Sequence, residues 1–200
     1  MSITTYAELK TAVADFLNRD DLTAVVPTFI ALAEARIARD LRHWRQEKRV
    51  STSFDERYEN LPNDWLEIID VSIPDGQVRA ISAAEMSYRY ERDDTAGKPA
   101  YFRIIADQLE FYPTPDAAYS GSLQYYARIP ALSDAAPDNW LLTNAPDVLL
   151  YGALLHTAPY LADDARVGVW ASLYQIAVDA LNAENMKSRV GGPLRIGVPR

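Results

Sequence analysis

The spacing of apolar residues changes twice along this chain of 200 residues, and that change limits the folds open to it. Near both ends, apolar residues recur every three or four positions, which is typical of a helix with one buried face. Between about Gln46 and Ile129 they alternate with polar residues, which is typical of strands. We therefore predict an α+β fold: a helical bundle of N- and C-terminal helices, an inserted small antiparallel β-sheet or sandwich, and an extended C-terminal tail. The predicted regions are a helical body of residues 1–45 and 131–188, a β-rich region of residues 46–130, and a tail of residues 189–200.

Two helices are predicted in the N-terminal part. Thr5 and Glu8 have the spacing of a capping box, which marks the start of the first helix. The second helix is expected to begin at about Pro27 and to run to about Leu41 or Trp44. The predicted apolar face of the first helix consists of Leu9, Val13, Phe16 and Leu17, and that of the second of Phe29, Ile30, Ala33, Ile37 and Leu41.

Two further helices are predicted near the C-terminus. Asn144 can cap a helix in which Pro146 and Asp147 occupy the first turn, where a missing N–H and a negative charge are both favourable. Pro159 should kink or end that helix, because it cannot donate to a carbonyl one turn back. The last helix should start at Asp163 or Asp164 and run to about Met186. Its apolar face consists of Val167, Trp170, Leu173, Tyr174, Ala177 and Leu181, and that of the preceding helix of Leu149, Leu150, Ala153, Leu154, Thr157 and Leu161.

Strands and one short helix are predicted in the middle of the chain. Pro74-Asp75-Gly76 is a strong turn signal after an alternating segment, and a hairpin turned at Asp107 should join residues 102–105 to 109–111. Ser82 and Glu85 repeat the capping-box spacing, which predicts a short helix through about Tyr90. The apolar positions of the other strands are Val50, Thr52, Phe54, Ile69, Val71, Ile73, Leu123, Tyr125, Ala127 and Ile129.

The composition excludes several classes of protein. No apolar run approaches the roughly 20 residues that span a bilayer, and the first residues lack the basic and apolar regions of a signal peptide. There are no cysteines, so neither a disulfide scaffold nor thiolate chemistry is expected. Residues 1–186 contain 16 basic and 28 acidic residues, a net charge of −12, whereas the remaining residues carry +4. Because phosphate binding depends on Lys and Arg, ordinary DNA binding is not expected.

Catalytic chemistry is not expected either. The chain has two histidines: His43 at a helix end is interpreted as a surface or capping residue, and His156 within a helix as a satisfied core or interface residue. No metalloprotease, nucleophile-elbow, phosphate-loop or dinucleotide-binding motif occurs. Asp93-Asp94 and Asp163-Asp164 could ligate a hard cation, but a loop tip and a helix cap explain them more simply. Paired carboxylates of a glycoside hydrolase stay possible, because the fold sets their spacing. We predict no enzyme, no cofactor and no metal site.

A basic row recurs at every third residue near the end of the second helix. One interpretation is a solvated face, since cations are favoured near a helix C-terminus. The other is an interface with acidic neighbours or DNA. An acidic body offers carboxylates on an adjacent copy, so we predict a subunit interface formed by Arg36, Arg39, Arg42 and Arg45.

The last residues cannot fold alone. Leu194, Ile196 and Val198 alternate as in a strand, yet an isolated heptapeptide after Gly191-Gly192 cannot bury them. One interpretation is a frayed terminus. The alternative is a strand that adds to the sheet edge or groove of another protein.

Several segments, taken in order, resemble the adaptor proteins of tailed bacteriophages, which attach the tail to the portal ring. The segments that carry this resemblance span nearly the whole chain: Thr5-Tyr6-Ala7-Glu8-Leu9, residues 18–22, residues 27–37, Leu61-Pro62-Asn63-Asp64-Trp65-Leu66, Gly97-Lys98-Pro99-Ala100-Tyr101-Phe102, residues 111–116, residues 123–126, residues 139–161 and residues 160–166.

The resemblance implies a structural role in the virion neck, after assembly in the host cytoplasm. It implies a ring of about twelve copies that matches the portal, with a tail or nozzle protein as a second partner. DNA would pass through the channel of this ring without specific binding. No membrane partner is implied. Phage adaptors commonly insert a C-terminal tail into the portal. The residues implied in portal binding are Pro193, Leu194, Arg195, Ile196, Gly197, Val198, Pro199 and Arg200.

Two other functions stay open on the sequence. The chain could be another neck or tail protein, such as a stopper or head-completion factor, which would bind a tail tube but not a portal. It could also be a carbohydrate-binding or hydrolytic virion protein that uses a tyrosine-rich sheet. Glycan binding by the monomer would favour that last function.

Overall fold

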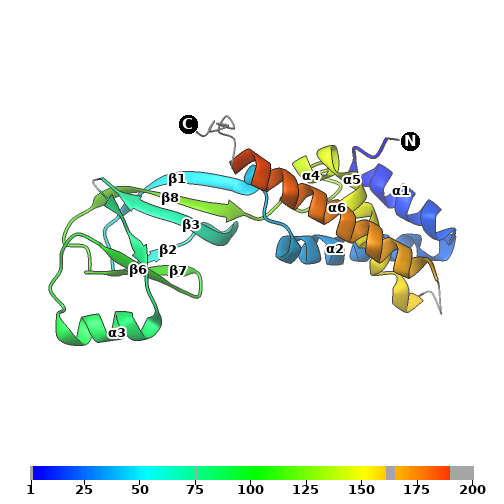
Figure 1. Ribbon diagram of the computed structural model, residues 1–200. Helices are drawn as coiled ribbons and strands as arrows, with labels where there is room; N and C mark the ends of the chain where they lie inside the picture. Colours follow the sequence, from blue (N-terminus) through cyan, green and yellow to red (C-terminus); the bar gives the residue numbers. More distant parts are fainter. Residues whose placement is uncertain (1, 75, 161–164, 190–200) are drawn as a thin grey trace, which may run out of the picture. The chain divides into compact units, whose positions relative to one another are not determined.

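The computed structural model describes residues 2–74, 76–160 and 165–189, which form helices at both ends of the chain and strands between them (Figure 1). The chain divides into two compact units. A helical unit contains Met1–Arg45 and Ile129–Arg200, and a β unit contains residues 46–128. The predicted α+β fold is confirmed. The predicted C-terminal tail falls mostly outside the described residues, apart from Arg189 at the end of the last helix.

The N-terminal helices begin close to the predicted positions. Helix α1 spans Tyr6–Leu17, and the predicted capping box is present, with Thr5 accepting from the Glu8 N–H and Glu8 accepting from the Thr5 N–H. A 3-10 turn, Asp20–Val25, leads into α2, Val26–Asp40, which is shorter than predicted. Phe16 was expected on the buried face of α1, but 46% of it is exposed. That prediction was wrong because the apolar face of α1 is centred on Leu9, Val13 and Leu17 and does not extend to Phe16.

Near the C-terminus the chain forms two helices where one was predicted. Helix α4 spans Trp140–Asn144 and α5 spans Pro146–Leu155. The cap assigned to Asn144 was wrong: Asn139 caps α4 by accepting from the Leu142 N–H at 2.9 Å, whereas the Asn144 side chain donates back to the Trp140 carbonyl. Helix α5 begins without a side-chain cap.

The end of α5 and the course of the last helix follow the prediction closely. Helix α5 ends before Pro159, and a 3-10 turn, Ala158–Tyr160, follows. The last helix, α6, spans Arg166–Arg189 and runs three residues beyond the predicted end. Its predicted caps, Asp163 and Asp164, lie outside the described residues, as does Leu161.

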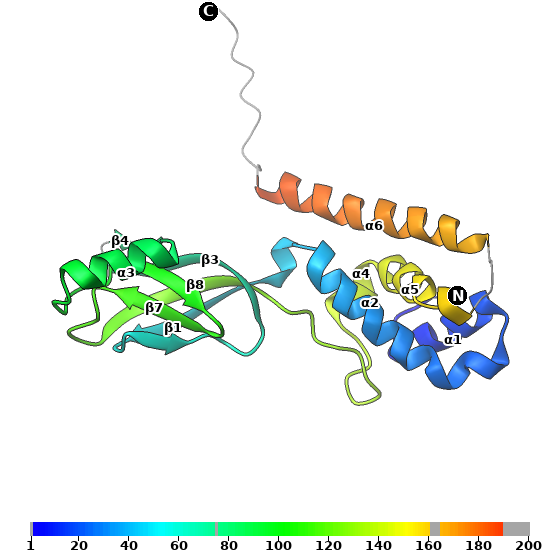
Figure 2. The ribbon, with the colours of Figure 1, turned by 90° about the horizontal axis from the view of Figure 1, so that it is seen from below.

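Helix α5 is the centre of the helical unit and lies between α2 and α6 (Figure 2). Val148, Leu149, Ala153 and Leu154 are all inaccessible to solvent. At Gly152 an added Cβ would lie 3.2 Å from Ala33 Cβ of α2 and 3.3 Å from the Tyr174 ring of α6. The absence of a side chain at this position therefore lets both neighbouring helices approach α5 closely.

The β unit contains two four-stranded sheets. Sheet A has the order β1-β8-β3-β4, and its pairs are antiparallel; sheet B has the order β2-β7-β6-β5. The parallel pair β5–β6 departs from the all-antiparallel prediction, because α3 separates these two strands in the sequence and returns the chain in the same direction. The elements of this unit, after a 3-10 turn at Trp44–Gln46, are β1 Glu47–Phe54, β2 Tyr58–Asn60, β3 Trp65–Ile73, β4 Gly76–Gln77, β5 Arg79–Ala80, α3 Ala83–Arg92, β6 Tyr101–Ile105, β7 Gln108–Tyr112 and β8 Tyr119–Ala127.

The two sheets bury one apolar cluster between them, as in a sandwich. Its members come from both sheets and include Phe54, Val71, Leu109, Phe111 and Leu123. The hairpin turned at Asp107 and the short helix after Ser82 are confirmed. Ile129 was predicted to line a strand, but β8 ends at Ala127 and Ile129 packs against the helical core.

Candidate interaction surfaces

His43 was interpreted as a surface or capping residue, and the surface interpretation was wrong, because its ring is buried between two tryptophan rings of the helical unit. The His43 ring is 1% exposed and lies between Trp44 and Trp140, with ring centroids 5.4 and 5.3 Å away. Burial lowers the pKa of His43, and it lowers that of His156 together with the nearby charges of Arg36 and Arg39. Each imidazole is therefore mainly neutral at pH 7.

No metal site is found in the part of the chain that the structure covers. Among the described residues, no group of three His, Cys, Asp or Glu side chains converges closely enough to hold a metal ion. Nor does any described helix combine the length and the apolar character that a bilayer span requires.

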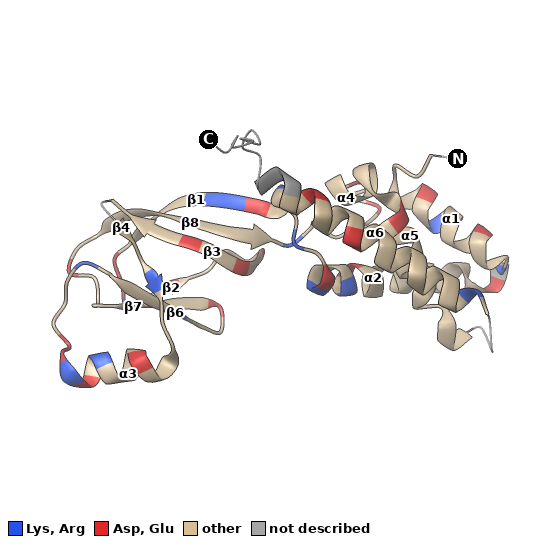
Figure 3. Cartoon of the chain, in the orientation of Figure 1, with Lys and Arg blue, Asp and Glu red and all other residues tan. Residues whose placement is uncertain are grey.

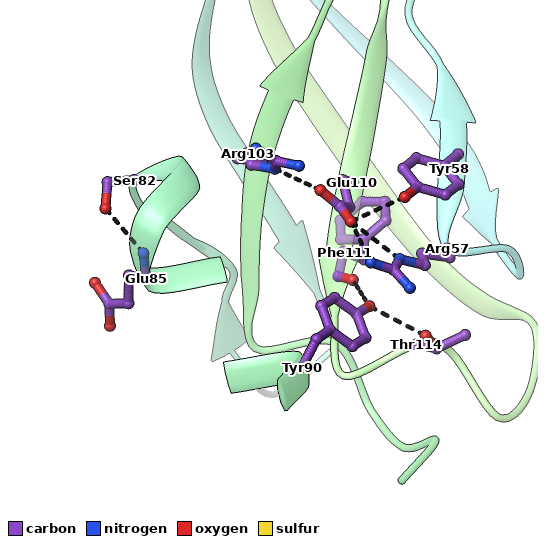
Figure 4. Close-up of polar contacts among 9 residues, drawn as sticks. All are labelled: Arg57, Tyr58, Ser82, Glu85, Tyr90, Arg103, Glu110, Phe111 and Thr114. Carbon is purple, nitrogen blue, oxygen red and sulfur yellow. Dashed lines mark hydrogen bonds and ion pairs between the residues drawn. The ribbon is translucent and has the colours of Figure 1, made fainter. Parts of the chain in front are cut away.

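A buried carboxylate organises sheet B (Figure 4). The Glu110 side chain is 1% exposed, and its Oε1 accepts from Arg57 Nη2 at 2.6 Å and from the Tyr58 hydroxyl at 3.1 Å, while Arg103 binds Oε2. The Arg57 guanidinium also stacks 3.6 Å from the centre of the Tyr90 ring. Burial by itself raises the pKa of Glu110, but these hydrogen bonds outweigh burial and hold the pKa below its ordinary value.

This cluster has a structural role rather than a catalytic one. Three side chains make four hydrogen bonds to the two oxygens of Glu110, so the carboxylate is ionised and compensated instead of poised to exchange a proton. The cluster joins β6, β7 and the segment that enters β2. No sequence pattern predicted it, although a glutamate between Leu109 and Phe111 in an apolar strand is the kind of signal that marks a paired buried charge.

Tyr125 and Tyr126 of sheet A lie in the interior rather than on an exposed platform for sugar. Tyr125 is 2% exposed and Tyr126 is 6% exposed. The Tyr125 hydroxyl donates to Asp64 at 2.9 Å, and burial, followed by that hydrogen bond, raises the pKa of Tyr125 to about 12. These side chains offer no exposed aromatic face for a glycan.

The comparison with known protein families covers almost the whole chain. The family model described as SU10 adaptor protein matches residues 4–197. The chain belongs to the SU10 adaptor protein family. This is a phage head-tail adaptor family, and the predicted resemblance to phage adaptors is confirmed. None of the curated proteins compared with the chain matches it.

Membership in this family makes the adaptor a structural component of a phage virion that interacts with other neck or tail proteins. The family is not a class of enzymes. The question for the adaptor structure is therefore which surfaces are available to such partners.

The four arginines of the predicted interface have different surroundings in the adaptor. Arg36 Nε lies 3.3 Å from Asp40 Oδ2, and its guanidinium lies 4.7 Å from the centre of the Tyr174 ring. Arg42 donates to the carbonyls of Ala38 and Leu41 at 2.7 and 2.8 Å, because α2 has already ended at Asp40.

The other two arginines, Arg45 and Arg39, differ in whether another side chain of the described residues contacts them. Arg45 stacks 4.7 Å from the centre of the Trp44 ring. Arg39 is exposed on the last turn of α2, and no hydrogen bond or ion pair is recorded for its side chain among the described residues. The four side chains thus have different surroundings, and Arg39 is the one for which the described residues provide no partner.

The residues implied in portal binding, from Pro193 to Arg200, lie outside the described residues.

Proposed function

We propose that this adaptor forms a closed ring, of twelve copies, which joins the portal to the tail and through which the genome passes. The observation that supports this function best is the family match, because it covers the helical unit, the β unit and most of the C-terminal segment together. A match to one unit alone would support only a shared domain. The role is mechanical: the chain holds partners in register and performs no chemical step.

The helical unit is the part we assign to ring contacts. A head-to-tail contact between unlike surfaces closes into a ring when its rotation divides a full circle. The chain has no long heptad pattern that would hold free copies together, so we expect a monomer in solution that assembles on the portal as a template.

The C-terminal residues are the part we assign to the portal. Leu194, Ile196 and Val198 would share one face of an added strand, and Arg195 and Arg200 supply positive charge for portal carboxylates. Gly191-Gly192 would provide the joint between α6 and this anchor. Because all copies in a ring act together, even a weak anchor would hold.

The charge of the body suits a conduit for DNA. Residues 1–186 carry a net charge of −12, so the ring would repel phosphates and let the genome slide. We assign no specific DNA contact to the chain.

A mass measurement tests this function. The purified adaptor is mixed with its cognate portal, and the mass of the complex is measured by native mass spectrometry or mass photometry. We expect one portal ring with twelve adaptor copies, and monomeric adaptor without portal. Failure to bind portal together with binding to a tail tube would identify a stopper or another neck protein instead. A stable oligomer of the adaptor alone at micromolar concentration would contradict the need for a template.

A further inference from the structure

The solvent-facing side of α6 is unusually poor in charge. Between Gly168 and Ala183 the only charged residue is Asp179, although one side of this helix faces water. Ile176 is 65% exposed, Val169 58% and Met186 69%. After its first turn the first half of α6 is a continuous uncharged ribbon in Figure 3. We call this surface the α6 outer face; it consists of Val169, Ser172, Ile176, Asp179, Ala183 and Met186.

Helix α2 has a surface of the same character with the opposite charge. Leu32 is 45% exposed, and the exposed positions around it are small or apolar up to Arg39. The other acidic and basic groups of α2 have partners inside the unit: Glu34 accepts from the Leu132 N–H at 2.7 Å, and Arg36 pairs with Asp40. We call this surface the α2 outer face; it consists of Thr28, Ala31, Leu32, Ala35 and Arg39.

Asp179 on the α6 outer face and Arg39 on the α2 outer face are both exposed and could each pair with a charge on another molecule. Asp179 accepts a hydrogen bond from Gln175 at 2.9 Å, but no cation is recorded beside it among the described residues, just as no carboxylate is recorded beside Arg39. A solvated helix face normally carries several charges, whereas a face that packs on a partner carries few. Here two such faces with one acid and one base occur on the same unit.

We propose that the α6 outer face of one copy packs on the α2 outer face of a second copy of this chain, with Asp179 paired to Arg39. This inference rests on the proposed ring, and it names the surfaces that close it. The two faces belong to different helices that flank α5, so the contact is head-to-tail and propagates from copy to copy. A contact between two identical faces would stop at a dimer.

The spacing of the residues fits an antiparallel arrangement of the two helices. Arg39 and Leu32 are seven residues apart, as are Asp179 and Met186, which is about 10.5 Å along a helix. With Arg39 opposite Asp179, Leu32 then faces Met186 and Ala35 faces Ala183, so the contact covers the C-terminal half of the α6 outer face, and Ile176 and Val169 lie beyond the end of α2. Small residues oppose each other at the middle of the contact, where they let the helices approach closely.

The contact would be weak on its own, which agrees with assembly on a template. We expect one helix laid along another to bury less than the about 1,200–2,000 Å² of stable protein complexes. Portal-bound neighbours are held at high effective concentration, so such a contact would form there and not in dilute solution.

A charge exchange tests the pairing. R39D and D179R are each expected to lower the strength of every adaptor–adaptor contact by about threefold, and this loss compounds around the ring to leave incomplete rings on the portal. The double variant R39D/D179R restores the pair and should recover complete rings. An equimolar mixture of the two single variants should also recover complete rings in which the variants alternate, because a pair of opposite charges forms at every mixed contact: the aspartate introduced by R39D meets the arginine introduced by D179R at half of these contacts, and native Asp179 meets native Arg39 at the other half. The readout is the number of adaptor copies on each portal by native mass spectrometry.

The control is R128D, which reverses an exposed arginine in the β unit. It should form complete rings. Melting curves of all variants check that the monomers are folded. If the wild type forms complete rings and R39D and D179R do as well, the assignment of these faces is wrong while the ring stands. If the wild type forms no ring on the portal, the proposed function itself is contradicted, and the assignment of the two faces has no basis. If D179R abolishes portal attachment and the double variant does not recover it, the α6 outer face contacts the portal.

Cross-linking gives a second, independent measurement. The chain has no cysteine, so A35C and A183C introduce the only thiols. A mixture of the two single variants on the portal should give disulfide-linked dimers, and the double variant should give a ladder of larger species. The absence of cross-links in rings of full size would overturn the antiparallel register.

Discussion

The hydroxyl of Tyr174 on α6 donates a hydrogen bond to Asp40 at the end of α2, with 2.9 Å between the oxygens. Asp40 Oδ2 also receives Arg36 from its own helix. Burial, and next this hydrogen bond, raise the pKa of Tyr174, so the phenol stays protonated and remains the donor. One carboxylate thus fixes the position of α6 against the C-terminal end of α2.

Replacing Tyr174 by phenylalanine removes this bond without changing the packing of the ring. We expect Y174F to lower the free energy of unfolding by about 1–2 kcal/mol, because Asp40 is partly exposed and water replaces part of the bond. Y160F is the matched control, since Tyr160 is 51% exposed. Urea denaturation measures both. Equal stability of the two variants would show that the bond contributes nothing.

Neutralising Glu110 should be the more damaging change in the β unit. E110Q leaves Arg57 and Arg103 without their counter-charge, and breaking a buried pair in this way typically costs about 3–5 kcal/mol. The two arginines are 35% and 23% exposed, so we expect about 2–4 kcal/mol here. E91Q, at an exposed position on α3, should change stability by less than about 0.5 kcal/mol. A thermal melt that ranks the two variants the other way would contradict this role.

The same cluster predicts a dependence of stability on pH. The pKa of Glu110 is lower in the folded protein than its ordinary value of 4.5. Its contribution is therefore complete above pH 4.5 and is lost as the pH falls below that value through the folded pKa. Stability measured between about pH 6 and pH 3 should fall less steeply for E110Q than for the wild type. Parallel curves would mean that other carboxylates dominate.

Gly121 is a position where only glycine fits. An added Cβ would lie 2.4 Å from the Phe54 ring and 2.7 Å from the Ser72 carbonyl oxygen. We expect G121A to cost about 1–3 kcal/mol, because the backbone of β8 must shift away from its neighbours. G168A is the contrasting variant: nothing lies within 4 Å of its added Cβ, and alanine within a helix should stabilise the protein by up to about 1 kcal/mol. If thermal denaturation gave the same change in melting temperature for G121A and G168A, the steric argument would be refuted.

Removing residues 191–200 should separate attachment from folding. Burial of Leu194, Ile196 and Val198 in a portal groove would contribute roughly 1.5–3 kcal/mol each, less the cost of ordering the segment. We expect the truncated protein to melt at nearly the same temperature as the full chain and to fail to co-sediment with portal. Binding as tight as that of the full chain would place the anchor in the helical unit instead.

Signals within a few residues of each other predicted the fold well. Thr5 and Glu8, or Ser82 and its following turn, fix a helix start through contacts three residues apart, and the sequence contains that information. The cap predicted at Asn144 was wrong because Asn144 is the last residue of a separate short helix, α4, which Asn139 caps and which the sequence patterns did not predict. Alternation also predicted the strands but not their partners.

Interactions between distant residues could not be predicted. The carboxylate of Glu110 meets Arg57 across 53 positions, and strand β5 meets β6 only after α3 has reversed the chain. The basic row shows the same limit: the second helix was predicted to run to about Leu41 or Trp44, whereas α2 ends at Asp40, so Arg42 and Arg45 follow the helix and have surroundings of their own.

The close approach at Gly152 has a mechanical consequence. Because α2 and α6 both pack closely against α5 at this position, a displacement of one helix there is opposed by its contacts with the others. A push on α6 would therefore move α2 as well, and strain would travel through a copy instead of being absorbed inside it. In the proposed ring, a force applied to one copy would therefore reach its neighbour with little loss within the helical unit.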